Sequence, residues 1–158
     1  MRNKTIMFLR LAIILVSAVI FVICAFMFYY VLNNPVNPKY AASLYPIITG
    51  LFLTTIPFYT ALYKAMKLLG YIDKNQAFTS TSVRSVKNIK ICAGCISILY
   101  MSMMPFIFIL ADTDDAPGAI LMGLVPIFIS AVICVGAYVF QKLLQQAVDI
   151  KNENDLTI

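Results

Sequence analysis

The sequence predicts an all-α integral membrane protein, a four-helix bundle with both termini in the cytoplasm and short amphipathic cytoplasmic helical extensions. Its 158 residues are 61% apolar, with a mean hydropathy of +0.88. Soluble proteins are roughly half apolar and about a quarter charged. The longest polar break, from Lys64 to Lys90, carries six basic residues against one acid, Asp73. Basic loops beside membrane spans stay in the cytoplasm, so this loop sets the topology of one four-span domain, residues 1–158.

The first span is expected at about residues 11–32, after a basic cytoplasmic arm. This run holds 22 residues without a charge. As a helix it is about 33 Å long, enough to cross a hydrocarbon core of about 30 Å. The run is too long for a signal peptide and offers no small-residue cleavage site, so we expect it to be retained.

The second span is expected at about residues 41–63, after a turn-rich outer loop at 33–38. Its helix should continue to Leu69. Pro57 frees the carbonyl group of Leu53, one turn back, and nearby Thr hydroxyls or neighbouring helices can compensate. A kinked packing helix is preferred here over a hinge.

The cytoplasmic loop covers residues 64–88. Gly70 is expected to end the second helix, and residues 71–77 to form a turn. Residues 78–82 supply several N-cap candidates for a new helix. An apolar stripe and a basic face follow, which predicts an amphipathic turn lying along the inner leaflet. The stripe is Val83, Val86 and Ile89, and the basic face is Arg84, Lys87 and Lys90.

The third and fourth spans are expected at about residues 89–110 and 119–140. Between them, residues 111–118 form an acidic outer loop. Asp115 is the predicted N-cap of the fourth span, with Pro117 in its first turn.

The cytoplasmic tail, residues 141–158, should begin as a continuation of the fourth helix. Its apolar residues follow the i, i+3, i+4, i+7, i+8 rule, at positions 140, 143, 144, 147 and 148. Residues 152–155 are expected to break the helix and leave residues 156–158 extended. This topology places eleven of the twelve basic residues inside.

Sequence motifs for catalysis are weak. The chain has no His, and no predicted span holds a charged residue, which argues against proton-coupled transport. No nucleophile–base pair or phosphate loop stands out, so neither an enzyme nor a cofactor is expected. The basic residues flank spans, where they meet lipid headgroups, so direct nucleic-acid binding is not expected. For Cys92 and Cys95, helix packing is preferred over a redox role.

The outer acidic cluster, Asp112, Asp114 and Asp115, is a weak metal candidate. Clustered carboxylates bind Ca²⁺ or Mg²⁺, but the loop lacks the length and spacing of an EF-hand. A helix cap with a solvated turn is preferred over a sensed cation or cationic ligand.

Three segments resemble the bacterial membrane-protein family catalogued as domain of unknown function 2975: residues 77–89, 111–118 and 147–158. The resemblance implies a four-span inner-membrane protein of unassigned activity. Members of the family are often encoded beside a small helix-turn-helix regulator of the Cro/C1 type, which implies a DNA-binding protein as a cytoplasmic partner.

The tail is the main candidate for partner binding. An anionic leaflet would repel its acids, and solubility alone does not require its apolar residues. A short acidic and apolar segment suits docking, either on the basic inner loop or in a partner's groove. The candidate residues are Asp149, Ile150, Glu153, Asn154, Asp155, Leu156 and Ile158, together with Arg84 and Lys87 of the loop.

The preferred function is a membrane-embedded regulator that couples an envelope signal to that cytoplasmic regulator. One alternative is a small-solute transport or immunity-type protein with a polar path along Thr49, Thr54, Thr55 and Tyr59. Another is a structural subunit of a membrane complex, and homo-oligomer formation is also left open.

Overall fold

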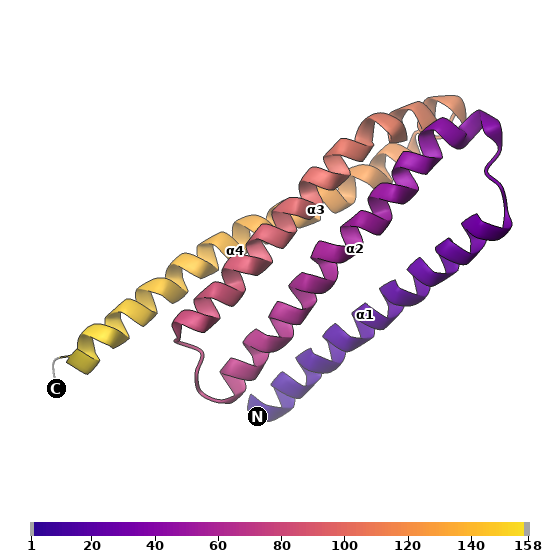
Figure 1. The fold of residues 1–158 in the computed structure, drawn as a ribbon. Helices are drawn as coiled ribbons and strands as arrows, with labels where there is room; N and C mark the ends of the chain where they lie inside the picture. Colours follow the sequence, from indigo (N-terminus) through magenta and orange to yellow (C-terminus); the bar gives the residue numbers. More distant parts are fainter. Residues whose placement is uncertain (1, 157–158) are drawn as a thin grey trace.

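The computed structural model describes the backbone of residues 2–156 and the side chains of residues 4–154. Its described part folds into α1 (Arg2–Asn33), α2 (Pro38–Asp73), α3 (Ser80–Thr113) and α4 (Gly118–Leu156). Successive helices run in opposite directions, joined by short turns (Figure 1). All four are long and apolar enough to cross a membrane, which confirms the all-α, four-span prediction.

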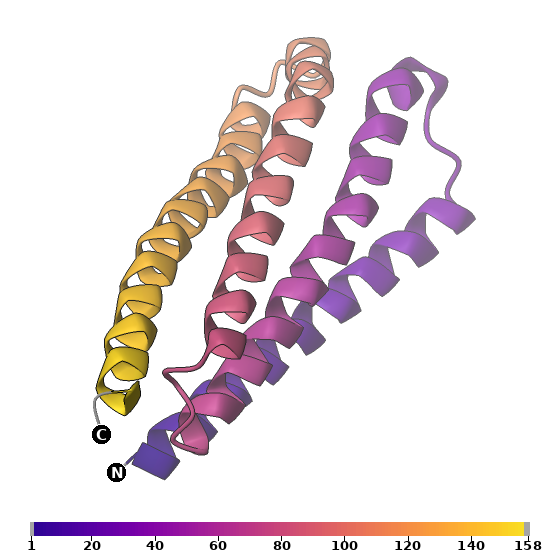
Figure 2. The same cartoon turned by 60° about the vertical axis from the view of Figure 1, so that its left-hand side comes forward.

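The helices form an open row in which each packs against its neighbour in sequence. Among the described residues, α1 packs on α2, α2 on α3, and α3 on α4, and the backbones of the other pairs of helices do not approach closely. Figure 2 shows α1 and α4 at opposite edges of this row. The order of the helices, which hydropathy does not reveal, is therefore the order of the chain.

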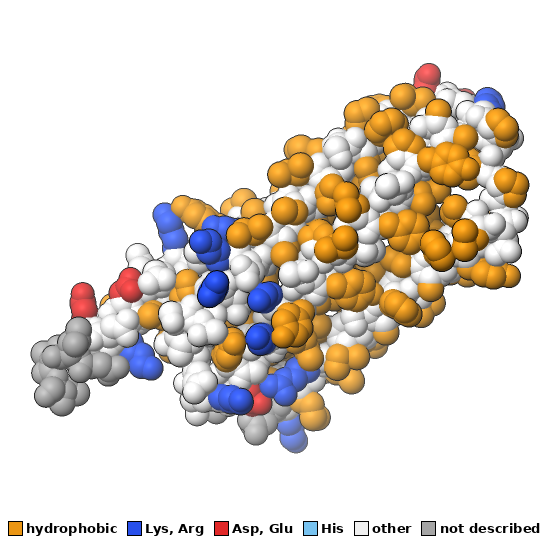
Figure 3. All heavy atoms as spheres, viewed as in Figure 1, with side chains coloured by type: hydrophobic (Ala, Val, Ile, Leu, Met, Phe, Trp, Pro, Cys, Tyr) orange, Lys and Arg blue, Asp and Glu red, His pale blue; other side chains and the backbone are white. Residues whose placement is uncertain are grey.

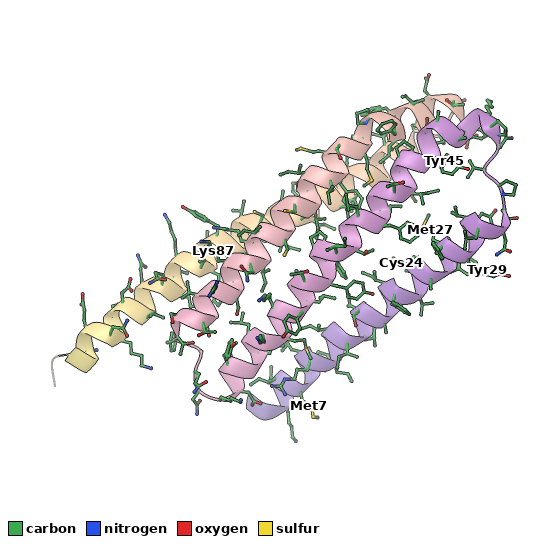
Figure 4. All side chains as sticks on the ribbon, in the orientation of Figure 1. Met7, Cys24, Met27, Tyr29, Tyr45 and Lys87 are labelled. Carbon is green, nitrogen blue, oxygen red and sulfur yellow. The ribbon has the colours of Figure 1, made fainter. Side chains whose placement is uncertain are left out.

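The contact between α1 and α2 uses long side chains. The rings of Phe28 and Phe52 meet edge to face, with centroids 5.9 Å apart. The hydroxyl of Tyr59 donates to the carbonyl oxygen of Ser17 across 2.9 Å. Met27 lies on the side of α1 that faces α2 (Figure 4). Between these contacts most apolar side chains of α1 remain exposed, as suits a helix with lipid along most of its surface.

The three other helices pack more closely, because glycines accept bulky side chains from α3. Met103 lies against Gly50 of α2, in the space that a Cβ atom would need. A Cβ atom at Gly123 of α4 would lie 2.8 Å from Sδ of Met104 and 2.9 Å from Cδ1 of Ile107. Small residues let transmembrane helices approach closely, and α3 is consequently the central packing element.

The turn after α2 differs from the prediction that Gly70 ends the helix. The helix continues to Asp73. Its end is made by Asn75, which has a φ of 58°, and by a hydrogen bond from Gln76 N to Tyr71 O of 2.8 Å. This is the Schellman pattern, which needs one residue in the left-handed region, and Asn tolerates that region well.

The turn after α3 has the same construction. Asp115 has a φ of 49°, and Ala116 N donates to Ala111 O across 2.9 Å. The prediction that Asp115 caps the fourth span is therefore wrong, because this residue closes α3 instead. Pro117 lies immediately before α4, which begins at Gly118.

The expected amphipathic turn along the inner leaflet is not separate from the third span. Thr79 is the N-cap of a single helix that continues to Thr113, and the Thr79 hydroxyl accepts a hydrogen bond from Ser82 N. Val83 and Val86 pack against α4 rather than facing lipid. This packing holds the segment in line with the span.

The tail also differs from expectation. Helix α4 continues to Leu156, so residues 152–155 do not break it. Adding a residue to an existing helix forms one hydrogen bond for each residue ordered. That gain exceeds the small unfavourable propensities of Asn and Asp, which amount to some tenths of a kcal/mol.

Candidate functional site

The two ends of the row differ in charge. We call the end with the start of α1, the 74–79 turn and the end of α4 the basic end. The end with the 34–37 and 114–117 turns is the acidic end. Figure 3 shows Lys and Arg side chains gathered toward the basic end, and hydrophobic side chains over much of the remaining length.

A polar groove lies between α2 and α3 at the basic end. It has a volume of about 260 Å³. Its α2 side has the spacing i, i+3, i+7, and its α3 side the spacing i, i+3, i+4, i+7. Both spacings place residues on one face of a helix. We call this the interhelical groove, and its lining residues are Lys64, Lys67 and Tyr71 of α2 with Thr81, Arg84, Ser85 and Asn88 of α3.

The groove carries positive charge that the neighbouring carboxylate does not neutralise. Asp73 is the only acid in the first 111 residues. Its Oδ2 atom accepts a hydrogen bond from Arg10 across 3.2 Å. The ammonium groups of Lys64 and Lys67 lie 5.9 Å and 5.5 Å from the ring centroid of Tyr63, an arrangement that leaves their positive charge in place.

The three basic residues of α3 have different neighbours, although they recur every three residues. Arg84 lines the interhelical groove. Lys90 lies over the ring of Tyr138 on α4, 5.2 Å from its centroid. Lys87, labelled in Figure 4, is exposed. Arg84 and Lys87, predicted together as partner-binding residues, therefore do not share one groove.

Beneath the basic surface, a small core joins α3 to α4. Val83 and Val86 pack against Leu144 and Val148, and Val86 is only 2% exposed. The stripe on α4 that the sequence predicts is thus confirmed at Leu144 and Val148. This core fixes the position of α4 up to Val148.

Beyond Val148, α4 projects from the row as an arm (Figure 1). We define the arm as residues 149–156. Asp149, Ile150, Glu153 and Asn154 are all exposed, and Asp149 accepts a hydrogen bond from Gln145 one turn earlier, at 2.9 Å. The side chains of the other predicted tail residues lie outside the described part: Asp155, Leu156 and Ile158.

The acidic end shows no arrangement of its carboxylates for a metal ion. Asp112, Asp114 and Asp115 are all exposed. Tyr40 donates a hydrogen bond to Asp114 across 3.1 Å, joining the start of α2 to this turn. Among the described residues, no three His, Cys, Asp or Glu side chains are grouped so as to hold a metal.

The predicted polar path along α2 has hydroxyl groups that already bond to backbone carbonyl groups. The hydroxyls of Thr54 and Thr55 donate to Leu51 O and Phe52 O of their own helix, rather than to the carbonyl freed by Pro57. Thr49 likewise donates within α2, to Tyr45 O, and Tyr59 reaches α1. These hydrogen bonds keep the hydroxyls of the three threonines within α2 and join Tyr59 to α1.

The two cysteines of the CxxC motif also have different surroundings. Cys92 is buried, whereas Cys95 is exposed, and both are free thiols. Between them, Gly94 lies against α4, where an added Cβ atom would be 3.7 Å from Sγ of Cys134. Close helix packing, the preferred interpretation, agrees with this contact.

Four membrane-length helices, an apolar exterior and a polybasic end define an α-helical integral membrane protein with four spans. Comparison with known sequences identifies its family. The chain belongs to the family described as Protein of unknown function (DUF2975), whose profile matches residues 33–158.

A similar protein is the uncharacterized membrane protein YoaS of Bacillus subtilis (strain 168). It is 49% identical over 160 residues, covering 100% of both chains. No solved structure matches the chain significantly. These comparisons agree with a membrane protein and assign no activity to it.

Proposed function

We propose that the protein is a membrane-embedded regulator whose arm binds a cytoplasmic helix-turn-helix transcription regulator of the Cro/C1 type. In this proposal the protein lies in the bacterial inner membrane with its basic end in the cytoplasm, as the positive-inside rule favours. The outer turns and the membrane helices would then respond to an envelope condition and change the availability of the arm.

The observation that carries the proposal is the exposed, helical arm. Residues 149–156 contain three acids and one base, and Ile150 is 61% exposed among them. An apolar side chain in a mainly acidic segment suits a protein partner with a basic rim around an apolar groove. A DNA-binding protein necessarily carries a basic surface, so an acidic arm and DNA would compete for it.

The arm is also separable from the rest of the fold. The core of Val83, Val86, Leu144 and Val148 ends where the arm begins. Removal of residues 149–158 should therefore leave the four helices intact. This separation favours docking of the tail on a partner over the alternative that the tail docks on the basic inner loop of the same protein.

The test is in-cell crosslinking followed by purification and mass spectrometry. We expect a Cro/C1-type regulator to be recovered with the full-length protein and lost on truncation after Val148. Ile150→Lys should reduce its recovery about tenfold, because a hot-spot side chain contributes more than about 1.4 kcal/mol.

Gln146→Lys is the matched control, since Gln146 is exposed on the same helix but lies before the arm. Equal recovery from the full-length and truncated proteins would refute the proposal. A separate variant changes Asp112, Asp114 and Asp115 together to Asn. If this variant recovers the regulator as the unaltered protein does under every envelope stress applied, the sensing role is refuted but the binding role of the arm is not.

A further inference from the structure

The interhelical groove combines cations with neutral hydrogen-bond donors. Lys64, Lys67 and Arg84 contribute positive charge, and Asn88 contributes an amide. Hydroxyl groups come from the remaining polar residues, Tyr71, Thr81 and Ser85. This combination of groups suits a phosphate. Ammonium and guanidinium groups donate short, charge-assisted hydrogen bonds to phosphate oxygens, and hydroxyl groups donate further hydrogen bonds to them.

The balance of charge makes an anionic ligand favourable. The nearest carboxylate in the sequence, Asp73, is already paired with Arg10. Three cations facing one small volume repel each other. A bound phosphate would relieve this repulsion, and partial desolvation between two helices would strengthen each contact.

We propose that the interhelical groove binds the phosphate of an anionic phospholipid headgroup. The groove lies where the apolar parts of α2 and α3 end. Tyr63, which is 58% exposed, is adjacent to Lys64, and tyrosines are enriched at the headgroup level of membranes. The volume of about 260 Å³ is below the range of about 300–1,000 Å³ that drug-sized ligands occupy.

An apolar track continues from the groove along α3. On α3, Ile91 and Ile98 follow Arg84 at successive intervals of seven residues, and they are 50% and 67% exposed. Residues seven apart lie on nearly the same face of a helix, so an acyl chain has a path below the headgroup.

The test is native mass spectrometry of the full-length protein in detergent, titrated with phosphatidylglycerol. We expect Arg84→Gln and Lys64→Gln each to weaken binding about tenfold, because each substitution removes a cation that makes a charge-assisted hydrogen bond to the phosphate. Arg84→Lys should retain most of the affinity. The retained helical circular dichroism of each variant shows that it has folded.

Lys87→Gln is the matched control, because it removes the same charge from an exposed position of α3 outside the groove. It should leave phosphatidylglycerol binding within about twofold of the unaltered protein. An equal loss in Lys87→Gln and Arg84→Gln would overturn the proposal in favour of diffuse attraction.

Soluble phosphate distinguishes the source of the ligand. We expect sn-glycerol 3-phosphate to displace the lipid only at concentrations at least a hundredfold higher, because it lacks the acyl chains that occupy the apolar track. Displacement at concentrations equal to those of the lipid would overturn the lipid assignment and indicate a soluble phosphorylated ligand. None of these outcomes depends on the partner of the arm.

Discussion

Met103 of α3 fills the space beside Gly50 of α2 that any larger side chain would require. The contact joins the two central helices in the membrane-spanning part of the row. Met103 is only 3% exposed, so its position depends on the absence of a side chain at residue 50.

Gly50→Leu should therefore separate α2 from α3 and lower the melting temperature in detergent. Overpacking a close contact costs about 1–3 kcal/mol. Gly136→Leu is the control, because nothing lies within 4 Å of a Cβ atom added there. Met103→Ala should partly restore the Gly50→Leu variant, and an unaltered melting temperature in Gly50→Leu would contradict this packing.

The core at the basic end should depend on Leu144 much more than on its neighbour. Leu144 is 6% exposed and packs on Val83 and Val86, whereas Leu143 is 58% exposed. We expect Leu144→Ala to reduce the free energy of unfolding by about 2 kcal/mol or more. Leu143→Ala should change it by less than about 0.5 kcal/mol. Equilibrium denaturation in mild detergent measures both values, and equal effects would show that α4 does not pack here.

The pair of Arg10 and Asp73 should position α1 while contributing little to stability. Their side chains are 39% and 36% exposed, and exposed ion pairs contribute about 0–1 kcal/mol. Asp73→Asn should therefore leave the melting temperature nearly unchanged. Spin labels at Lys4 and Lys74 should nevertheless show a broader distance distribution, because the contact that closes this end of α1 and α2 is lost. A distribution as narrow as that of the unaltered protein would show that other contacts hold α1.

The basic end should lie in the cytoplasm. In a variant with the four native cysteines changed to Ala, Gln76→Cys would report the basic end and Asn34→Cys the acidic end. Both positions are exposed. A membrane-impermeant thiol reagent should label Asn34→Cys in intact cells and Gln76→Cys only after lysis, because lysine and arginine retain a loop inside. The reverse pattern would invert the topology.

Part of the interhelical groove can be predicted from the sequence, namely which residues share a face on each helix. Lys64, Lys67 and Tyr71 have a one-face spacing that can be read directly from the chain, and so do Thr81, Arg84 and Ser85. What the spacing does not show is that these two faces meet. For the same reason the sequence predicts one shared surface for Arg84 and Lys87, although of these two residues only Arg84 lines the groove.

The four membrane helices follow from the amino-acid sequence, because each long apolar run must satisfy its backbone hydrogen bonds internally in lipid, whatever its neighbours are. The sequence also determined the charge difference between the two ends. The folded structure was needed to show that Asn75 rather than Gly70 closes α2, that Asp115 ends α3, and that Val83 and Val86 face α4. The two helix ends depend on which residue takes up the left-handed conformation. The packing of Val83 and Val86 depends on which helix faces meet, and several pairings of apolar stripes bury similar areas, so hydropathy cannot choose among them.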